Sequence, residues 1–298
     1  MTEQKTSLRE ANARAVVEGI LSEKKLEAKV VEGKKVIRGS LVIQTDDTNF
    51  ITFDVFVNAL TKNGTPNKNY KSMETIMEEY HSIAEVGKDN ATRVKVTNGS
   101  IRPRTYFDDN GQHDILSYSS NFFNRVQNEL APSADFEVEL FISAITREVD
   151  SNGDETGRVI VKGWMPTYSG IEPLTLVAPV EDDIANSIEA SFEPGQTVEF
   201  YGEIVNRCIV KDETIPVKIG KPKVRTKRTY KNELLITGAS EAYEEGLTSK
   251  LPYDAETIKQ AIREREIRLD EMKNRGKAST SAPTSASTAS ASGRKLPF

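Results

Sequence analysis

The sequence has few of the residues on which disulfide frameworks and histidine-based metal sites depend. Its only cysteine, Cys208, excludes a disulfide framework and a cysteine-rich metal site. The two histidines, His81 and His113, lie too far apart in sequence to form a paired-histidine zinc motif. No apolar run approaches the roughly 18 residues of a transmembrane helix, and the first residues do not resemble a signal peptide. We therefore expect a soluble protein of a reducing compartment, the cytoplasm, with no membrane, metal or cofactor partner.

Motifs that would indicate an enzyme are missing as well. The sequence contains no phosphate-binding glycine loop, no dinucleotide-binding fingerprint and no nucleophile elbow. Residues 150–154 are rich in aspartate but lack the distal glutamate of a calcium loop, so they predict a hairpin turn. The neighbouring carboxylates Asp182 and Asp183 suit the start of a helix. We therefore expect no catalytic activity.

The length and composition predict two domains followed by a disordered end. A chain of 298 residues is long enough for two domains of ordinary size. Its hydrophobic content of 37% is low, and residues 278–292 contain only alanine, serine, threonine and one proline. We place a disordered linker at residues 276–292 and a separate tip at residues 293–298. Leu296, Pro297 and Phe298 in this tip suit a peptide that docks in a partner's pocket, the alternative being a frayed end.

The residue pattern over positions 10–130 predicts one β-rich domain. Runs of β-branched and aromatic residues at 36–43 and 50–57 predict two strands. Apolar residues from Met73 to Ala84 then recur at helical spacing, with Ser72 placed to cap the helix. Strand patterns resume at residues 92–101 and again around 115–126.

The region at residues 134–240 repeats this order. It has strand patterns at 135–149, 157–165 and 174–177, then a short helical pattern with Ile184, Ile188 and Phe192 on one face, and strands again at 196–210. Residues 91–101 and 195–204 also look alike, which we take as a weak internal repeat. Three strands, a helix and two strands are the order of an OB-fold barrel. We therefore predict a mainly β protein of two tandem OB-fold-like barrels, each with one helix.

A final helix is predicted at residues 254–275. Asp254 is suited to its N-cap, and a narrow apolar stripe runs along one side, formed by Ile258, Ala261, Ile262, Leu269 and Met272. Such a stripe fits packing against one of the barrels, and a dimer contact is the alternative.

Positive charge is concentrated locally, although the formal net charge is −5. Residues 90–107 contain four basic residues and no acid, and residues 217–232 contain seven basic residues and no acid. Local positive charge is what a phosphate backbone needs, whatever the net charge of the chain. The alternative is an ordinary solvated strand face, which fits the second window less well than the first.

Several aromatic residues are expected on outward-facing strand surfaces. Alternation in the strand at 50–57 directs Phe53 and its apolar neighbours to the core and leaves Phe50 and Phe56 among polar residues. By the same rule Trp164 shares a face with Arg158 and Lys162. Aromatic side chains on an OB barrel provide stacking platforms for bases. Each one alone is as compatible with packing in a core or between domains, and the combination across both units favours DNA binding.

The charge windows and the aromatic patches together define the candidate nucleic-acid contacts. The candidate DNA-binding residues are Arg38, Phe50, Phe56, Arg93, Lys95, Arg102, Arg104, Tyr106, Tyr118, Phe122, Arg125, Arg158, Lys162, Trp164, Lys223, Arg225, Lys227, Arg228 and Tyr230.

With these features the chain resembles single-stranded DNA-binding proteins. Its last three residues are similar to the hydrophobic tip of the bacterial family, although Arg294 and Lys295 stand where bacterial tips carry aspartates. Two units in one chain with such a tail look like replication proteins encoded by bacteriophages of Gram-positive hosts. The resemblance implies coating of single-stranded DNA during replication, recombination or repair, and recruitment of replication and repair enzymes by the tip.

Two other functions remain open on the sequence. Two β-rich domains with a Ser/Ala/Thr-rich tail also suit a phage virion or assembly protein, in which the outward aromatics would be subunit contacts. An accessory factor such as a helicase loader would touch DNA only through a partner. The acid-free basic windows favour DNA binding over a virion role.

Overall fold

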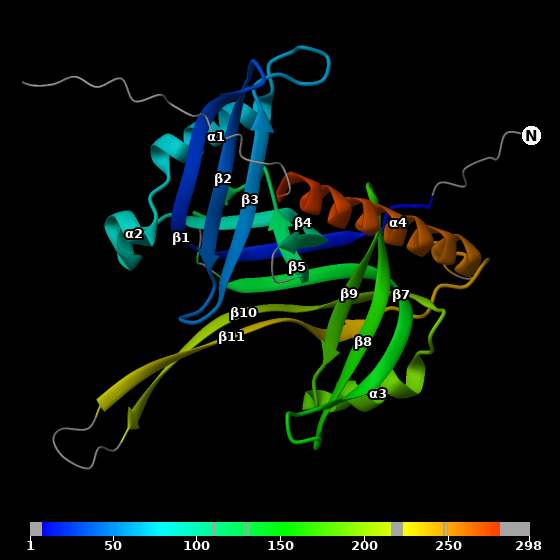
Figure 1. Ribbon diagram of the computed structural model, residues 1–298. Coiled ribbons are helices and arrows are strands. Elements are labelled where there is room, and N and C mark those ends of the chain that lie inside the picture. Colours follow the sequence, from blue (N-terminus) through cyan, green and yellow to red (C-terminus); the bar gives the residue numbers. More distant parts are fainter. Residues whose placement is uncertain are drawn as a thin grey trace, which may run out of the picture.

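Strands dominate the protein and form a single eleven-stranded sheet that closes into two barrels (Figure 1). The computed structural model describes residues 8–108, 111–127, 129, 131–215, 223–246, 248 and 250–280. The predicted tip with Leu296, Pro297 and Phe298 lies outside the described residues. Residues 281–292 of the predicted linker lie outside them as well. Among the described helices, none has the length and apolar character needed to cross a membrane.

The first barrel contains five long strands that close on themselves. Its strands are β1 (Ala13–Val31), β2 (Lys34–Gln44), β3 (Phe50–Asn58), β4 (Arg93–Asp108) and β5 (Gly111–Ser119). They are hydrogen-bonded in the order β1-β2-β3-β5-β4, and β4 returns to pair with β1. Only the β3–β5 pair is parallel. Between β3 and β4 come α1 (Lys68–Glu79), α2 (Ile83–Val86) and the 3₁₀ turn η1 (Lys88–Asn90), and the short β6 (Asn124–Arg125) pairs with β4.

The second barrel repeats this topology strand for strand. Its elements are β7 (Ser133–Val149), β8 (Glu155–Thr167), β9 (Gly170–Ala178), η2 (Glu181–Asp183), α3 (Ile184–Ser191), β10 (Thr197–Ile215) and β11 (Lys223–Ala239). The order is β7-β8-β9-β11-β10, with β10 returning to β7 and a parallel β9–β11 pair. A five-stranded closed barrel with its helix between strands three and four is an OB-fold. The predicted fold class, mainly β with two tandem OB-fold barrels, is confirmed, although the first barrel carries two helices, α1 and α2, where one was predicted.

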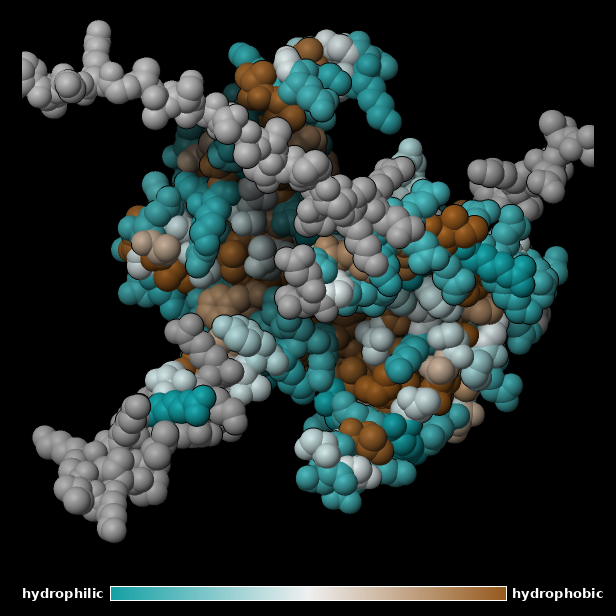
Figure 2. All heavy atoms as spheres, viewed as in Figure 1, coloured by the Kyte–Doolittle hydropathy of each residue, from teal (hydrophilic) through white to brown (hydrophobic). Residues whose placement is uncertain are grey.

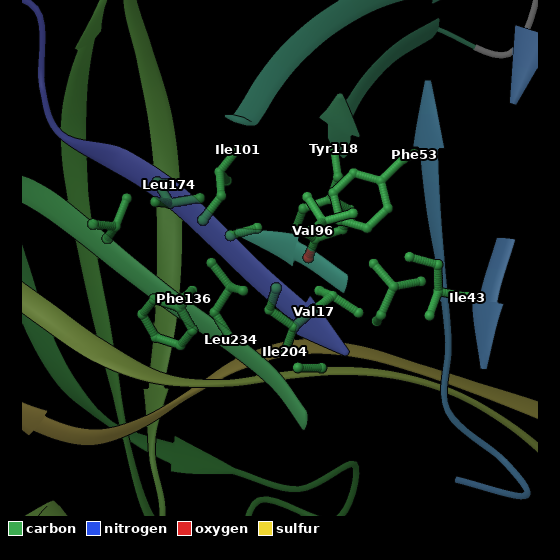
Figure 3. Close-up of a cluster of buried hydrophobic side chains, with 14 of the residues drawn as sticks. Val17, Ile43, Phe53, Val96, Ile101, Tyr118, Phe136, Leu174, Ile204 and Leu234 are labelled. Carbon is green, nitrogen blue, oxygen red and sulfur yellow. The ribbon is translucent and has the colours of Figure 1, made fainter. Parts of the chain in front are cut away.

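One hydrophobic core passes through both barrels. In β3, Ile51, Phe53, Val55 and Val57 are buried, as strand alternation predicts. In Figure 3 side chains of the first barrel, such as Val17 and Phe53, lie in the same cluster as Phe136 and Leu234 of the second. The two barrels share this core because β1 pairs with β7 over Ala13 to Glu18.

A buried asparagine joins the barrels at a second place. Asn49, in the turn between β2 and β3, donates from Nδ2 to the carbonyl oxygen of Ile204 at 3.1 Å. Its Oδ1 accepts from the backbone N–H of Asn206 at 2.6 Å. Both partners belong to β10, and the backbone N–H of Cys208 donates to the carbonyl oxygen of Thr48 beside them at 3.2 Å, so side-chain and backbone bonds together join the two domains here.

Helix α1 begins, and the last helix ends, at residues other than those predicted. Helix α1 is capped by Asn67, whose side chain accepts from the N–H of Asn69, rather than by Ser72, which lies inside the helix. Asp254 caps the last helix as predicted, accepting from the N–H of Thr257 at 2.8 Å. This helix, α4 (Ala255–Thr280), continues past the predicted end at residue 275 into the segment predicted as linker.

Helix α4 packs on the second barrel, one of the two alternatives that its apolar stripe left open. Ile258 is buried against Phe141, Ile171 and Tyr253, and Ala261 and Ile262 pack on the same cluster. In Figure 1 α4 runs across the second barrel toward the first.

Strands β10 and β11 extend beyond the barrel as a two-stranded ribbon (Figure 1). Their pairing runs from Phe200 opposite Ala239 to Ile215 opposite Lys223, with one shift in register between Tyr201 and Gly202. The sequence predicted strand structure only as far as residue 210. Residues 211–215 and 223–232, which are mostly polar, therefore form strand that the sequence analysis did not predict.

Candidate nucleic-acid interface

Three adjoining grooves follow the outer surface of β4 and β5. Their volumes are about 260, 500 and 620 Å³. The first and second share Asp54, Ser100, Arg102 and Ser119 as lining residues, and the second and third share Pro103 and Arg104. The shared residues make one continuous path, which we name the β4–β5 groove. The second barrel supplies its other wall, first through residues 165–169 and then through β9, β10 and β11.

The floor of the β4–β5 groove combines small hydroxyl residues with two exposed arginines. Ser100, Arg102 and Arg104 alternate on the outer face of β4, because Ile101 between them is buried. Ser117 lies opposite Arg102 on β5. The guanidinium groups of Arg102 and Arg104 form no ion pair or hydrogen bond with any other residue that the structure describes. Both predicted cations are therefore free to contact phosphate.

Two exposed aromatic side chains flank one end of this groove. Phe56 is 56% exposed and Phe122 is 51% exposed, and both line the first groove together with Arg102. Phe56 faces outward because strand alternation buries Val55 and Val57. Arg38 lies directly opposite Phe56 in the β2–β3 register and pairs with Glu27 at 3.1 Å. This ion pair is half exposed and contributes little, so Arg38 can exchange Glu27 for a phosphate.

Tyr118 is almost buried, although it is among the residues that line the third groove, so its contact with DNA stays a prediction. It is 7% exposed and belongs to the core, where its ring lies 6.0 Å from that of Phe53 (Figure 3). Burial raises the pKa of its hydroxyl above the usual tyrosine value. The segment predicted as one strand, residues 115–126, ends as a strand at Ser119, and within it Tyr118 alternates inward.

Trp164 and Arg158 are engaged in contacts within the protein. Trp164 is partly buried in the cluster beneath α4, and the guanidinium carbon of Arg265 lies 5.9 Å from its ring centroid. Arg158 pairs with Glu233 at 2.7 Å and with Glu148 at 3.4 Å. The alternation argument placed both side chains on the outer face of β8, but α4 and β11 cover that face. We therefore leave both residues out of the interface.

Lys95 and Arg125 have structural partners as well. Lys95 pairs with Glu18 at 2.7 Å, and its hydrogen bond holds the pKa of this nearly buried carboxyl below the usual range. The guanidinium carbon of Arg125 lies 4.8 Å from the ring centroid of Tyr80. The positive charge of both residues is thus partly engaged, and neither lines the β4–β5 groove.

Four other predicted residues lie on the surface but apart from the groove. Arg93 is exposed at the start of β4, and Lys162 is exposed on β8. Phe50 is only partly exposed at the start of β3. Tyr106 is 42% exposed near the end of β4 and stacks on His113 with ring centroids 5.0 Å apart.

The basic window of the second unit lies on the ribbon. Arg225 and Tyr230 are exposed on β11, and Tyr230 is 66% exposed. Lys223, Lys227 and Arg228 belong to the same strand. The ribbon strands over residues 207–215 and 223–231 have seven basic and two acidic residues, so this projection carries an excess of positive charge. Elsewhere the surface seen in Figure 2 is largely hydrophilic, with hydrophobic residues gathered over β8 and β9 below α4.

A known family matches this chain over most of its length. The model of the YorF family matches residues 12–275, which include both barrels and most of α4. The chain belongs to the YorF family. No curated protein matches its sequence.

Two solved structures of the single-stranded DNA-binding protein from Thermus aquaticus are similar to this YorF-family chain. The wild-type structure has a TM-score of 0.46 at 9% identity and covers 81% of this chain and 98% of its own. A deletion mutant has a TM-score of 0.45 at 9% identity and covers 81% of this chain and 99% of its own. The OB-fold assignment of both barrels rests on the strand order and register of this chain itself.

The YorF-family chain also has a groove residue that the sequence analysis missed. Tyr168 lies in the tight turn between β8 and β9, is 93% exposed and lines the second groove. The same groove is lined by Arg102, Arg104 and Ser117, which belong to the other barrel. The sequence did contain a signal for an exposed stacking residue, because Tyr168 is an aromatic residue within the polar turn formed by residues 167–170. The sequence could not indicate that this turn meets the first barrel.

Proposed function

We propose that the protein binds single-stranded DNA without sequence preference and coats it during replication, recombination or repair. The observation that supports this most is the continuity of the β4–β5 groove, in which unpaired arginines alternate with serines between exposed aromatic rings. Phosphates would follow Arg102 and Arg104, while bases would stack on Phe56 and Phe122. Every base has a π-face, so stacking of this kind does not select a sequence.

The form of the site favours a single strand over a duplex. Bases stacked on Phe56 and Phe122 have to be unpaired and splayed from their neighbours, because rings on a barrel surface cannot reach inside a stacked duplex. The end of the groove that Phe56 borders reaches strand three, part of the face of strands two and three on which OB-folds hold oligonucleotides. Phe56 belongs to strand three and Arg38 to strand two of the first barrel.

The ribbon adds a second contact to this proposal. Strands β10 and β11 continue well beyond the barrel as a two-stranded ribbon. A two-stranded ribbon is only marginally stable in water by itself, so a bound DNA strand would stabilise this one. Its excess of basic residues fits a phosphate backbone, and Tyr230 offers a further ring for stacking. A strand leaving the groove would thus meet positive charge on the ribbon. Recruitment of partner enzymes through Leu296, Pro297 and Phe298 stays a prediction from the sequence.

The proposal is tested by measuring the anisotropy of fluorescein-labelled DNA with the full-length protein. We expect binding to oligo(dT) that is much tighter than binding to a duplex of equal length, and that weakens as salt rises from 50 to 200 mM. Counterion release from the phosphates causes this salt dependence. Equal affinity for the two forms of DNA, or no binding to either, would contradict the proposal and favour a subunit-contact role for the exposed aromatics.

A further inference from the structure

We propose that helix α4 is a clamp that holds Tyr168 over the β4–β5 groove, with Arg265 and Arg268 as its positioning residues. The inference rests on the proposed function and adds to it a third stacking ring, one that the second barrel presents to DNA bound on the first.

Arg268 fixes the turn that carries Tyr168. Its guanidinium group donates to the carbonyl oxygen of Ser169, the residue after Tyr168, and pairs with Glu172 at 3.0 Å. Gly170 ends the turn with a φ of +136°, a conformation that favours glycine. A Cβ at this position would lie only 2.6 Å from Arg268 Nη1. The turn and the arginine therefore fit closely, and α4 determines where Tyr168 is presented.

Arg265 ties the same helix to the other wall of the groove. It is 6% exposed, and it pairs with Glu172 of β9 at 2.9 Å. From Nη2 it donates to Thr105 Oγ1 at 2.5 Å, and it lies 3.8 Å from Asp114. Thr105 and Asp114 belong to β4 and β5 and line the third groove. One buried guanidinium thus connects α4, the second barrel and the hairpin of the first.

These contacts fix the distance between the two walls. A buried arginine is expensive unless its hydrogen bonds are satisfied, so its presence in the packing face of α4 needs a reason. The apolar contacts of Ile258 already attach the first turns of the helix to the barrel. Arg265 and Arg268 attach the following turns to the two elements that border the groove, which pure apolar packing on the second barrel would not do.

The test compares alanine variants of the full-length protein in oligo(dT) binding. Tyr168→Ala should weaken binding roughly 5- to 140-fold, the loss expected for one stacked base. Arg268→Ala should weaken it through the same ring, so the double variant Tyr168→Ala/Arg268→Ala should bind no worse than Tyr168→Ala alone. The salt slope of Arg268→Ala should equal that of the wild type, whereas loss of a phosphate contact would lower it by about 0.7.

Arg263→Ala is the matched control, because Arg263 is exposed on the same helix and its loss removes the same charge. The clamp is refuted if Arg268→Ala binds like Arg263→Ala, or if its effect adds fully to that of Tyr168→Ala.

A readout without DNA separates the clamp from the proposed function. Trp164 is the sole tryptophan and lies under Arg265. Acrylamide should therefore quench its fluorescence more strongly in Arg265→Ala than in the wild type or in Arg263→Ala. Unchanged quenching in a folded Arg265→Ala protein would overturn the clamp even if the wild type binds DNA. Increased quenching in a protein that binds no DNA would leave α4 as a clamp and refute the proposed function alone.

Discussion

Replacing Phe56 and Phe122 together by alanine should weaken oligo(dT) binding by about 2–6 kcal/mol, since one stacked base is worth about 1–3 kcal/mol. Both rings are more than half exposed, so their removal should leave the free energy of unfolding nearly unchanged. Anisotropy titrations give the affinity, and urea unfolding of the same variants gives the stability.

Tyr201→Ala is the control for the loss of an exposed aromatic side chain. Tyr201 is 47% exposed on β10 but lines none of the three grooves. Its removal should leave oligo(dT) affinity unchanged. If the Phe56/Phe122 variant binds as tightly as Tyr201→Ala, bases do not stack at that end of the groove.

The double variant Arg102→Ala/Arg104→Ala should flatten the salt dependence of binding. Each phosphate contact to a single strand contributes about 0.7 to the slope of log K against log salt, so the pair should lower it by about 1.4. The affinity should fall most at low salt, where counterion release is worth most. The measurement is a series of oligo(dT) titrations at four or more salt concentrations.

Lys259→Ala/Arg263→Ala removes the same amount of charge from the exposed side of α4, away from the groove. Its slope should equal that of the wild type. Equal slopes for the two double variants would show that Arg102 and Arg104 act only through the general field of the protein and do not contact the phosphates.

Strand alternation predicted Phe56 correctly and Trp164 incorrectly for one physical reason. Alternation tells which side of its own sheet a residue faces, and both residues do face outward. What lies against that side depends on distant parts of the chain. Nothing described in the structure covers Phe56, whereas α4, which begins at Ala255, packs over Trp164. The prediction that α4 packs on a barrel was available, but the sequence did not indicate which face it would cover.

Long strands with polar residues on both faces were the other elements that the sequence did not reveal. The outer half of β1 is rich in lysine and glutamate, and the outer part of the ribbon is rich in basic residues. Neither shows the alternation of a half-buried strand. Both form because a neighbouring strand continues the hydrogen-bonded ladder, with β1 following β2 as far as Val31 opposite Lys34. The β4–β5 groove was equally hidden, since its second wall comes from the other barrel.

Photocrosslinking to oligo(dT) containing bromodeoxyuridine tests the location of the bound strand most directly. The reactive base couples to side chains that it touches, and mass spectrometry of the digested protein identifies them. We expect crosslinks to Phe56, Phe122 and Tyr168, which border one continuous groove contributed by both barrels. Crosslinks confined to α1, α3 or the outer face of α4, with none at these three rings, would contradict the account.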